Sequence, residues 1–267
     1  MARARKRHRQ LDMLNAAGTR LWKDPGKRAR VLSRRRKLGR PRKPNAGVPH
    51  TTREAFKASE PLHVVLRVVK ELRGLRRRAL YHAIREATLV AARNSEQFRI
   101  VHLSIQQTHI HLLVEAQHRS ALSRGMQGFK ISAAKQINAA VSKGRDERRR
   151  GQVFADRYHA EVIRVPRQAR HALAYVLNNW RKHREDRGPR SRTWLVDPFS
   201  TGWSFNGWRQ LEGKLTLWPV PESYLPMFVW LPRTWLLTEG WRRHGLIDGH
   251  EVPSQPLRAR SRAHAVH

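Results

Sequence analysis

The 267-residue chain contains no cysteine, which excludes disulfide bonds, cysteine-ligated zinc and a thiol nucleophile. It also lacks long apolar runs, and the longest of them are far too short for a helix that crosses a bilayer. The basic N-terminus leads into no apolar segment of the kind that marks a secretory signal. We therefore expect a protein of a reducing compartment, the cytoplasm, without a membrane span.

Acidic residues are scarce, because 20 Asp and Glu stand against 55 Lys and Arg, which gives a formal net charge of +35. So large an excess of positive charge attracts polyanions, either nucleic acid or an acidic membrane surface. The hydrophobic content of 39% is enough for a folded core in one or two domains. Nucleic acid is the partner that best fits a basic protein of this compartment.

Three regions of the chain differ in composition. Residues 1–49 form a basic arm that we expect to be largely disordered, because residues 1–43 contain 17 Lys and Arg against 2 acids and prolines follow. Such an arm is either a solvated tail or a non-specific contact for phosphates. Residues 50–187 carry the regular patterns of a folded domain. Residues 188–267 are an irregular extension that holds seven of the nine tryptophans, is rich in proline and ends in a second basic tail.

Hydrophobic spacing in the central region predicts alternating strands and helices. The expected strands are residues 62–69, 98–105, 109–115 and a strand-like stretch at 151–164, and the expected helices are residues 76–94, 120–143 and 166–184. The order β-α-β-β-α-β-α contains no repeat of parallel βα units, so it favours an antiparallel sheet with helices packed on it. We therefore predict an α+β, ferredoxin-like fold.

His109 and His111 are the sharpest candidates for a functional site. Residues i and i+2 of a strand share a face, so both imidazoles are expected to point the same way while Ile110 points into the core. Two convergent imidazoles supply half of a divalent-metal site. Two histidines on a strand are also common as solvated or core-rim residues, so the pair alone leaves both interpretations open.

The last predicted helix adds a second group. Tyr175 and Asn179 are four residues apart, so they are expected on one face of the helix. The amide oxygen of Asn179 could complete a metal site beside the tyrosine hydroxyl, with Arg181 and Lys182 close by. The alternative is a buried tyrosine that only satisfies a hydrogen bond.

Together, these motifs resemble a known family. THIHLLVE, which contains His109 and His111, resembles the HUH motif, in which U is hydrophobic. YVLNN, which contains Tyr175 and Asn179, resembles the tyrosine helix of single-tyrosine HUH transposases, especially the REP-associated tyrosine transposases of the IS200-like superfamily. GQVFADRYHAEVI is similar to the stretch that precedes that helix. The resemblance covers roughly residues 60–185, and the motifs occur in the expected order.

The resemblance implies a DNA transposase that cleaves and rejoins single-stranded or hairpin DNA. It implies that Tyr175 is the nucleophile and forms a 5′-phosphotyrosine, and that His109, His111 and Asn179 hold Mg²⁺ or Mn²⁺. DNA would be the partner and would place the protein on the nucleoid. The resemblance is compatible with a monomer or a homodimer.

Several cations are candidate phosphate contacts, each with an ordinary surface role as its alternative. Arg67 shares a strand face with His63 and would lie near the metal if that strand neighbours the HUH strand. The remaining candidates are Arg124, Lys130, Lys135, Arg157, Arg181 and Lys182.

Two other functions stay open. One is a non-catalytic basic protein that binds nucleic acid, such as a decayed or domesticated transposase. Loss of one motif member would favour it, and every member stands in this sequence. The other is an HUH replication initiator or relaxase, which would normally come with a helicase-like region or several tyrosines near the site, and neither is visible.

Overall fold

The computed structural model describes residues 54–93, 96–188, 191–212 and 223–253. The chain divides into two units, residues 1–46 and residues 47–267. The first unit, the predicted basic arm at 1–49 and the basic tail from residue 254 onward lie outside the described residues. All of the described residues belong to the second unit.

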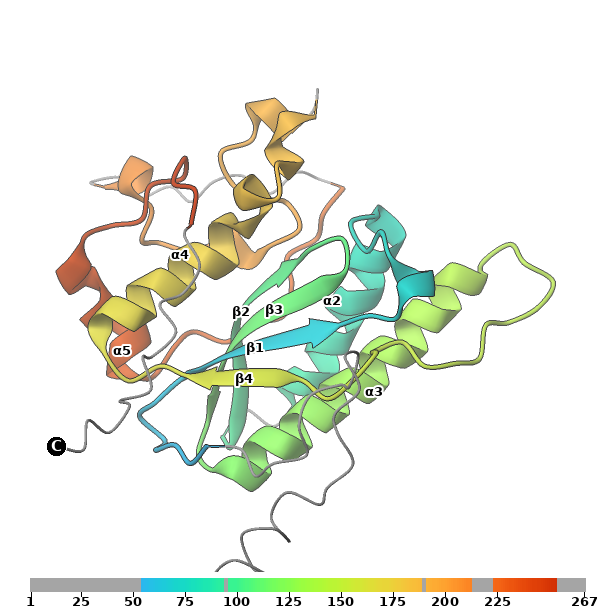
Figure 1. Ribbon diagram of the computed structural model, residues 1–267, viewed down its shortest axis with the longest axis horizontal. Helices are drawn as coiled ribbons and strands as arrows, with labels where there is room; N and C mark the ends of the chain where they lie inside the picture. The colour runs from blue at the N-terminus through green and yellow to red at the C-terminus, as the bar shows by residue number, and fades with distance from the viewer. Residues whose placement is uncertain (1–53, 94–95, 189–190, 213–222, 254–267) are drawn as a thin grey trace, which may run out of the picture. The chain divides into compact units, whose positions relative to one another are not determined.

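A four-stranded sheet forms the centre of the fold (Figure 1). Its strands are β1 (Leu62–Arg67), β2 (Phe98–Ile105), β3 (His109–Ala116) and β4 (His159–Val162). They lie in the order β2-β3-β1-β4, and every neighbouring pair is antiparallel. Helices connect β1 to β2 and β3 to β4, so this is the ferredoxin-like arrangement and the predicted fold class is confirmed.

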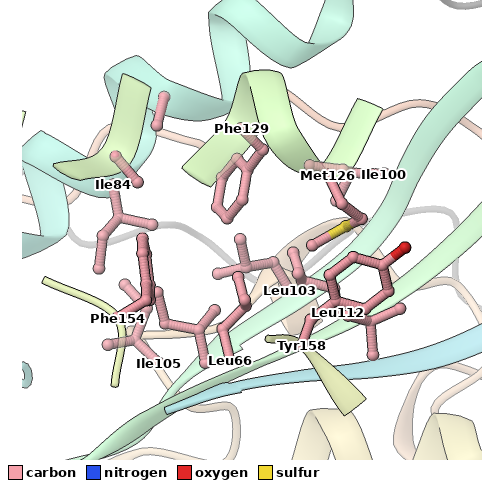
Figure 2. Packing of buried hydrophobic residues seen from close by; sticks show 14 of the residues in the cluster. Leu66, Ile84, Ile100, Leu103, Ile105, Leu112, Met126, Phe129, Phe154 and Tyr158 are labelled. Atoms are coloured by element: carbon pink, nitrogen blue, oxygen red, sulfur yellow. The ribbon is translucent and has the colours of Figure 1, made fainter. Parts of the chain in front are cut away.

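Two long helices cover one face of the sheet. These helices, α2 (Arg78–Ala92) and α3 (Arg119–Ser142), pack against each other and against β2. The buried cluster between helices and sheet includes Leu66, Ile84, Leu103, Leu112, Met126 and Phe129 (Figure 2). Because strand side chains alternate between the two faces, the residues between the buried strand positions point away from α2 and α3.

The opposite face of the sheet is covered by α4 (Pro166–Lys182). Pro166 occupies the first turn of the helix, where the missing N–H of proline costs no hydrogen bond. The apolar face of α4 packs on Leu113 of β3, and Trp208 and Trp241 from the region after α4 complete this second buried cluster. The extension therefore shares a core with α4.

Short helical turns make up most of the remaining regular structure. They are η1 (Lys70–Leu72), η2 (Glu185–Arg187), η3 (Ser191–Thr193), η4 (Thr201–Ser204), η5 (Arg209–Leu211), α5 (Trp235–Thr238) and η6 (Gly240–His244). Across the part of the chain that the structure describes, none of the helices combines the length and the apolar character that crossing a bilayer requires.

Buried carboxylates attach the extension to the sheet. Asp197 is fully buried and accepts two hydrogen bonds from the guanidinium of Arg76, each 2.8 Å long. Glu115, near the end of β3, accepts hydrogen bonds of 2.8 Å from both the backbone N–H and the hydroxyl of Thr234. The extension is irregular, as its composition predicts, and these polar contacts fix its path.

The strand-like stretch predicted at 151–164 is shorter in the structure. Only β4 forms a continuous strand there, and Phe154 makes a single bridge to Val68. The Asp156 side chain accepts a hydrogen bond from the backbone N–H of Arg157, a local contact that competes with ladder pairing. Both Phe154 and Tyr158 reach the core on the α2 and α3 side (Figure 2).

Candidate active site

The two histidines of the HUH motif lie next to each other on β3. Their ring centroids are 4.5 Å apart, and Ile110 between them is buried on the other face of the sheet. His111 is buried, while His109 at the start of the strand is partly exposed. Because β3 pairs with β1 on one side and β2 on the other, strand hydrogen bonds fix the backbone of both histidines.

One nitrogen of each imidazole already has a partner. Nδ1 of His109 is 3.0 Å from the hydroxyl of Thr108, and Nδ1 of His111 is 3.0 Å from Nε2 of His63. These contacts leave Nε2 of each ring for another ligand. Nε2 of His111 is buried and has no hydrogen-bond partner among the described residues. A buried polar atom without a partner is costly, so it calls for a physical explanation.

Burial keeps the imidazoles of this cluster neutral. It lowers the pKa of His63 to about 4 and the pKa of His109 to about 4, and it lowers the pKa of His111 well below the ordinary value. Repulsion between the neighbouring imidazoles acts in the same direction. A neutral imidazole keeps the lone pair that binds a metal ion.

Tyr175 of α4 packs against these histidines. Its ring centroid lies 5.2 Å from that of His111 and 5.7 Å from that of His63, in edge-to-face geometry. Burial raises the pKa of the Tyr175 phenol, so the hydroxyl is protonated at neutral pH. The ammonium of Lys182 lies 5.0 Å from the centre of the same ring. The structure therefore brings together the two motifs that are far apart in the sequence.

Asn179 lies one helical turn after Tyr175, on the same face of α4. His183, a further turn along, has its ring 5.7 Å from that of His109, so residues on both sides of Asn179 contact the histidine cluster. The Asn179 side chain is fully buried, and neither its oxygen nor its nitrogen has a hydrogen-bond partner within the described part of the chain.

The unpaired polar atoms fit a divalent cation. Within the residues that the structure describes, no three His, Asp or Glu side chains are arranged to hold a metal ion, so a site built on the imidazole pair would have to include a ligand of another type. The amide oxygen of Asn179, which is buried and without a partner among the described residues, is an atom of that type. Nitrogen and oxygen ligands together suit Mn²⁺, and Mg²⁺ prefers the oxygen.

The candidate phosphate contacts fall into separate groups. Arg67 is exposed and pairs with His109 across the strands, and Lys182 contacts Tyr175, so both cations border the histidine cluster. The candidates on α3, which covers the other face of the sheet, are Arg124, Lys130 and Lys135.

Arg181 and Arg157 have other surroundings. The guanidinium of Arg181 donates hydrogen bonds to the carbonyls of Leu195 and Gly249 and pairs with Asp186, so it holds the extension against α4. Arg157 is partly buried in the turn before β4. A role for either residue in DNA binding stays a prediction.

The sequence patterns assign no role to His63 or His183, although both rings lie in the cluster. The signal for His183 is its spacing, since it continues the stripe that begins with Tyr175 and Asn179 at intervals of four residues. The sequence alone does not reveal His63, because its ring reaches His111 only through the pairing of β1 with β3.

The fold and the site together define a class of protein. An antiparallel α+β sheet carries an HUH pair on a central strand, and a covering helix carries a tyrosine against that pair. Residues 60–179 match the protein family described as transposase, IS200-like. This segment runs from just before β1 to Asn179 and includes both motifs. Over these residues the chain is similar to the IS200-like transposases.

Solved structures that match parts of this chain are distant in sequence. A REP-associated tyrosine transposase bound to a REP hairpin is 18% identical, with a TM-score of 0.45 over 65% of this chain and 90% of that chain. A protein of Deinococcus radiodurans R1 proposed to be a transposase is 14% identical, with a TM-score of 0.33 over 52% of this chain and 96% of that chain. A bacterial tRNA(His) guanylyltransferase-like protein in complex with GTP is 11% identical, with a TM-score of 0.35 over 62% and 77%. No curated protein matches, and the similarity to the IS200-like transposase family rests on the match over residues 60–179.

Proposed function

We propose that this protein is a transposase that cleaves and rejoins single-stranded or hairpin DNA, with Tyr175 as the nucleophile and with His109, His111 and Asn179 as ligands of Mg²⁺ or Mn²⁺. One observation carries the proposal. The Tyr175 ring lies 5.2 Å from the ring of His111, whose buried Nε2 has no partner among the described residues. A phenol beside two neutral imidazoles is the set of groups that metal-assisted phosphoryl transfer to tyrosine requires.

The proposed chemistry conserves the energy of the phosphodiester. The Tyr175 oxygen attacks the phosphorus, the bond from phosphorus to the 3′ oxygen breaks, and the strand ends as a free 3′-OH. The phenol proton leaves to solvent, which the partly exposed ring can reach, and the departing 3′ oxygen takes up a proton. The product is a 5′-phosphotyrosine. Attack by a second 3′-OH reverses these steps and joins two strands without ATP.

Burial raises the pKa of Tyr175, and the active site has to overcome this stronger hold on the phenol proton. A free phenol, with a pKa of about 10, is already mostly protonated at neutral pH, and burial shifts this equilibrium further toward the protonated form. A divalent cation held by His109, His111 and Asn179 would neutralise charge on a non-bridging phosphate oxygen and make the phosphorus easier to attack. Packing of Tyr175 against His111 and His63 fixes where the phenol lies relative to that phosphate.

DNA is the proposed partner, at the face of the sheet that carries the histidines. Arg67 and Lys182 border this face, and these positions support a role for both as contacts of phosphates next to the scissile one. Because Tyr175 and His111 of one chain already contact each other, we propose that the tyrosine acts on phosphate bound by its own chain. Such a site needs no second copy of the chain, so a monomer would suffice.

The test is formation of a covalent adduct. Single-stranded oligonucleotides that cover imperfect palindromes in the DNA flanking the gene would carry a fluorophore at the 3′ end, so that a 5′-phosphotyrosine leaves the label on the protein in a denaturing gel. Adduct is expected with Mg²⁺ or Mn²⁺, and Tyr175→Phe should abolish it. Tyr224→Phe is the matched control, because Tyr224 lies in the extension and packs against Tyr81 and Phe199.

Each contrary result has a defined meaning. An adduct that survives in Tyr175→Phe would assign the nucleophile to another residue. Cleavage that survives when His109 and His111 are both replaced by alanine would overturn the metal ligands. A wild-type protein that binds these oligonucleotides but forms no adduct under any metal condition would favour the alternative function, a non-catalytic protein that binds nucleic acid.

A further inference from the structure

His63 occupies a fixed place directly behind one of the two HUH histidines. It lies on β1, which pairs with β3 so that Val65 is opposite His111 and His63 is opposite Leu113. His63 and His111 are therefore diagonal neighbours on the same face of the sheet. Their rings stack at 26° with 5.1 Å between centroids, and Nε2 of His63 is 3.0 Å from Nδ1 of His111. The His63 side chain is 6% exposed.

This contact bears on which nitrogen of His111 carries the proton. A neutral imidazole has one N–H and one lone pair, and the partner of one nitrogen decides the state of the other. If Nδ1 of His111 donates its proton to Nε2 of His63, Nε2 of His111 keeps its lone pair. That Nε2 is the buried atom without a partner among the described residues. The opposite arrangement, with His63 as donor, would put the proton on Nε2 and block it as a ligand.

We propose that His63 is a positioning residue that accepts the Nδ1 proton of His111 and so holds that ring in the tautomer and orientation that bind a metal through Nε2. The inference rests on the proposed function, since it assigns a task to His63 only if His111 is a metal ligand. Partners behind metal-binding histidines are usually carboxylates, backbone carbonyls or water. Here a buried, neutral imidazole takes that place, which orients the ligand without adding negative charge.

His63 contacts both reacting parts of the site. Besides its bond to His111, its ring lies 5.7 Å from the ring of Tyr175. The second HUH histidine has a simpler partner, because Nδ1 of His109 faces the hydroxyl of the adjacent Thr108. Loss of His63 would therefore free the His111 ring while the His109 ring keeps its partner.

The experiment compares three variants by their affinity for Mn²⁺ alone, measured by electron paramagnetic resonance on the full-length protein. His63→Leu removes the acceptor and keeps an apolar side chain in the buried position. His63→Gln restores an acceptor near the position of Nε2. His159→Leu is the control, because His159 is an exposed histidine on the neighbouring strand β4 of the same sheet.

We expect His63→Leu to weaken Mn²⁺ binding by about 10- to 100-fold, the range found for residues behind metal ligands. His63→Gln should bind close to wild type, and His159→Leu should not differ from it. Nitrogen-15 shifts of the Mg²⁺-bound protein supply a second measurement, and they should place the proton of His111 on Nδ1 in the wild type and in His63→Gln. Circular dichroism would establish that the variants are folded.

Three results would overturn the inference. Equal Mn²⁺ affinity of wild type and a folded His63→Leu would mean that His63 does not position the ligand. Loss of binding as complete as in His111→Ala, without rescue by Gln, would make His63 a ligand itself. A wild-type protein that binds no Mn²⁺ would remove the metal centre of the proposed function, and this failure is distinct because it precedes any comparison of variants.

Discussion

The ring of Tyr175 on α4 meets the ring of His111 on β3 edge to face, at 89° and with 5.2 Å between centroids. The two elements are held together by more than this contact, because α4 packs on β3 through Leu113 and the apolar cluster around it. Helix and strand therefore share one packed core within a single chain. A tyrosine supplied by another copy would have to displace a helix that is part of the core.

Mixing two inactive variants tests whether the tyrosine acts within its own chain. Tyr175→Phe keeps the histidines, and a variant with both His109 and His111 replaced by alanine keeps the tyrosine. If each active site is built from one chain, the mixture should form no more adduct than either variant alone, measured on 3′-labelled oligonucleotide. Recovery of adduct that rises with total protein concentration would instead mean that helices are exchanged between two copies.

Asn179 offers a test that separates stability from metal binding. Both polar atoms of its side chain are buried and have no partner among the described residues, so replacing it with leucine removes an unsatisfied amide. The metal-free Asn179→Leu protein should have a free energy of unfolding equal to wild type or larger, by about 1 kcal/mol. Its affinity for Mn²⁺ should fall by more than about tenfold, because a ligand is lost. Urea unfolding and metal titration measure the two quantities.

The adjacent residue is the control for Asn179. Asn178 is equally buried, but its side-chain N–H donates to the backbone carbonyl of Asp248. Asn178→Leu should therefore destabilise the protein by about 1 kcal/mol and leave the affinity for Mn²⁺ unchanged. A stability loss in Asn179→Leu with unchanged Mn²⁺ affinity would assign Asn179 to packing and remove it from the site.

Arg67 and Arg124 carry the same charge on opposite faces of the sheet, which makes them a matched pair for DNA binding. Arg67 lies beside His109, whereas Arg124 lies on α3 and bonds to the side chain of Gln97. If DNA lies on the face with the histidines, Arg67→Ala should weaken binding of single-stranded DNA and reduce the salt dependence of log Kd by about 0.7. Arg124→Ala should change neither quantity. Fluorescence anisotropy at several salt concentrations measures both, and equal effects of the two variants would mean that both faces bind DNA.

Much of the fold can be predicted from the periodic spacing of hydrophobic residues in the sequence. The alternation from Leu62 to Val68 marks β1, and the regular spacing of apolar residues marks the three long helices, so the predicted and observed boundaries of these elements differ by only a few residues. The exception is the stretch at 151–164, where bulky apolar residues predict an extended strand. There, the side chain of Asp156 accepts a hydrogen bond from the next backbone N–H, a local contact that the spacing of apolar residues does not reveal.

The candidate site was only partly accessible from sequence. The spacing of residues within one strand or one helix predicts that His109 lies beside His111 and that Tyr175 lies beside Asn179, since each pair shares a face of its element. This spacing does not place His63, because its contact with His111 depends on the register between β1 and β3. It also does not separate Arg67 from the cations of α3, since the face that a helix covers is a property of the tertiary fold.

His102 connects the sheet to the extension and makes the stability of that contact depend on pH. It is buried on β2, and its Nδ1 is 3.1 Å from the hydroxyl of Thr201 in the extension. Burial lowers the pKa of His102 to about 4, below the value of about 6.5 in an unfolded chain. The folded protein therefore favours the neutral ring, and the unfolded chain binds the extra proton between these two pKa values.

The sign of the effect follows from this difference. The contribution of neutral His102 is fully present above pH of about 6.5 and is lost as the pH falls toward about 4. Wild type should lose about 2 kcal/mol of its free energy of unfolding between about pH 7 and pH 5 beyond what His102→Asn loses, since asparagine keeps a polar group near Nδ1 but does not titrate. Urea unfolding of both proteins at each pH measures the difference, in which the shared titration of the other histidines cancels. If the free energies of unfolding of wild type and His102→Asn fall in parallel as the pH is lowered, the His102 ring accepts its proton without disturbing the contact with Thr201.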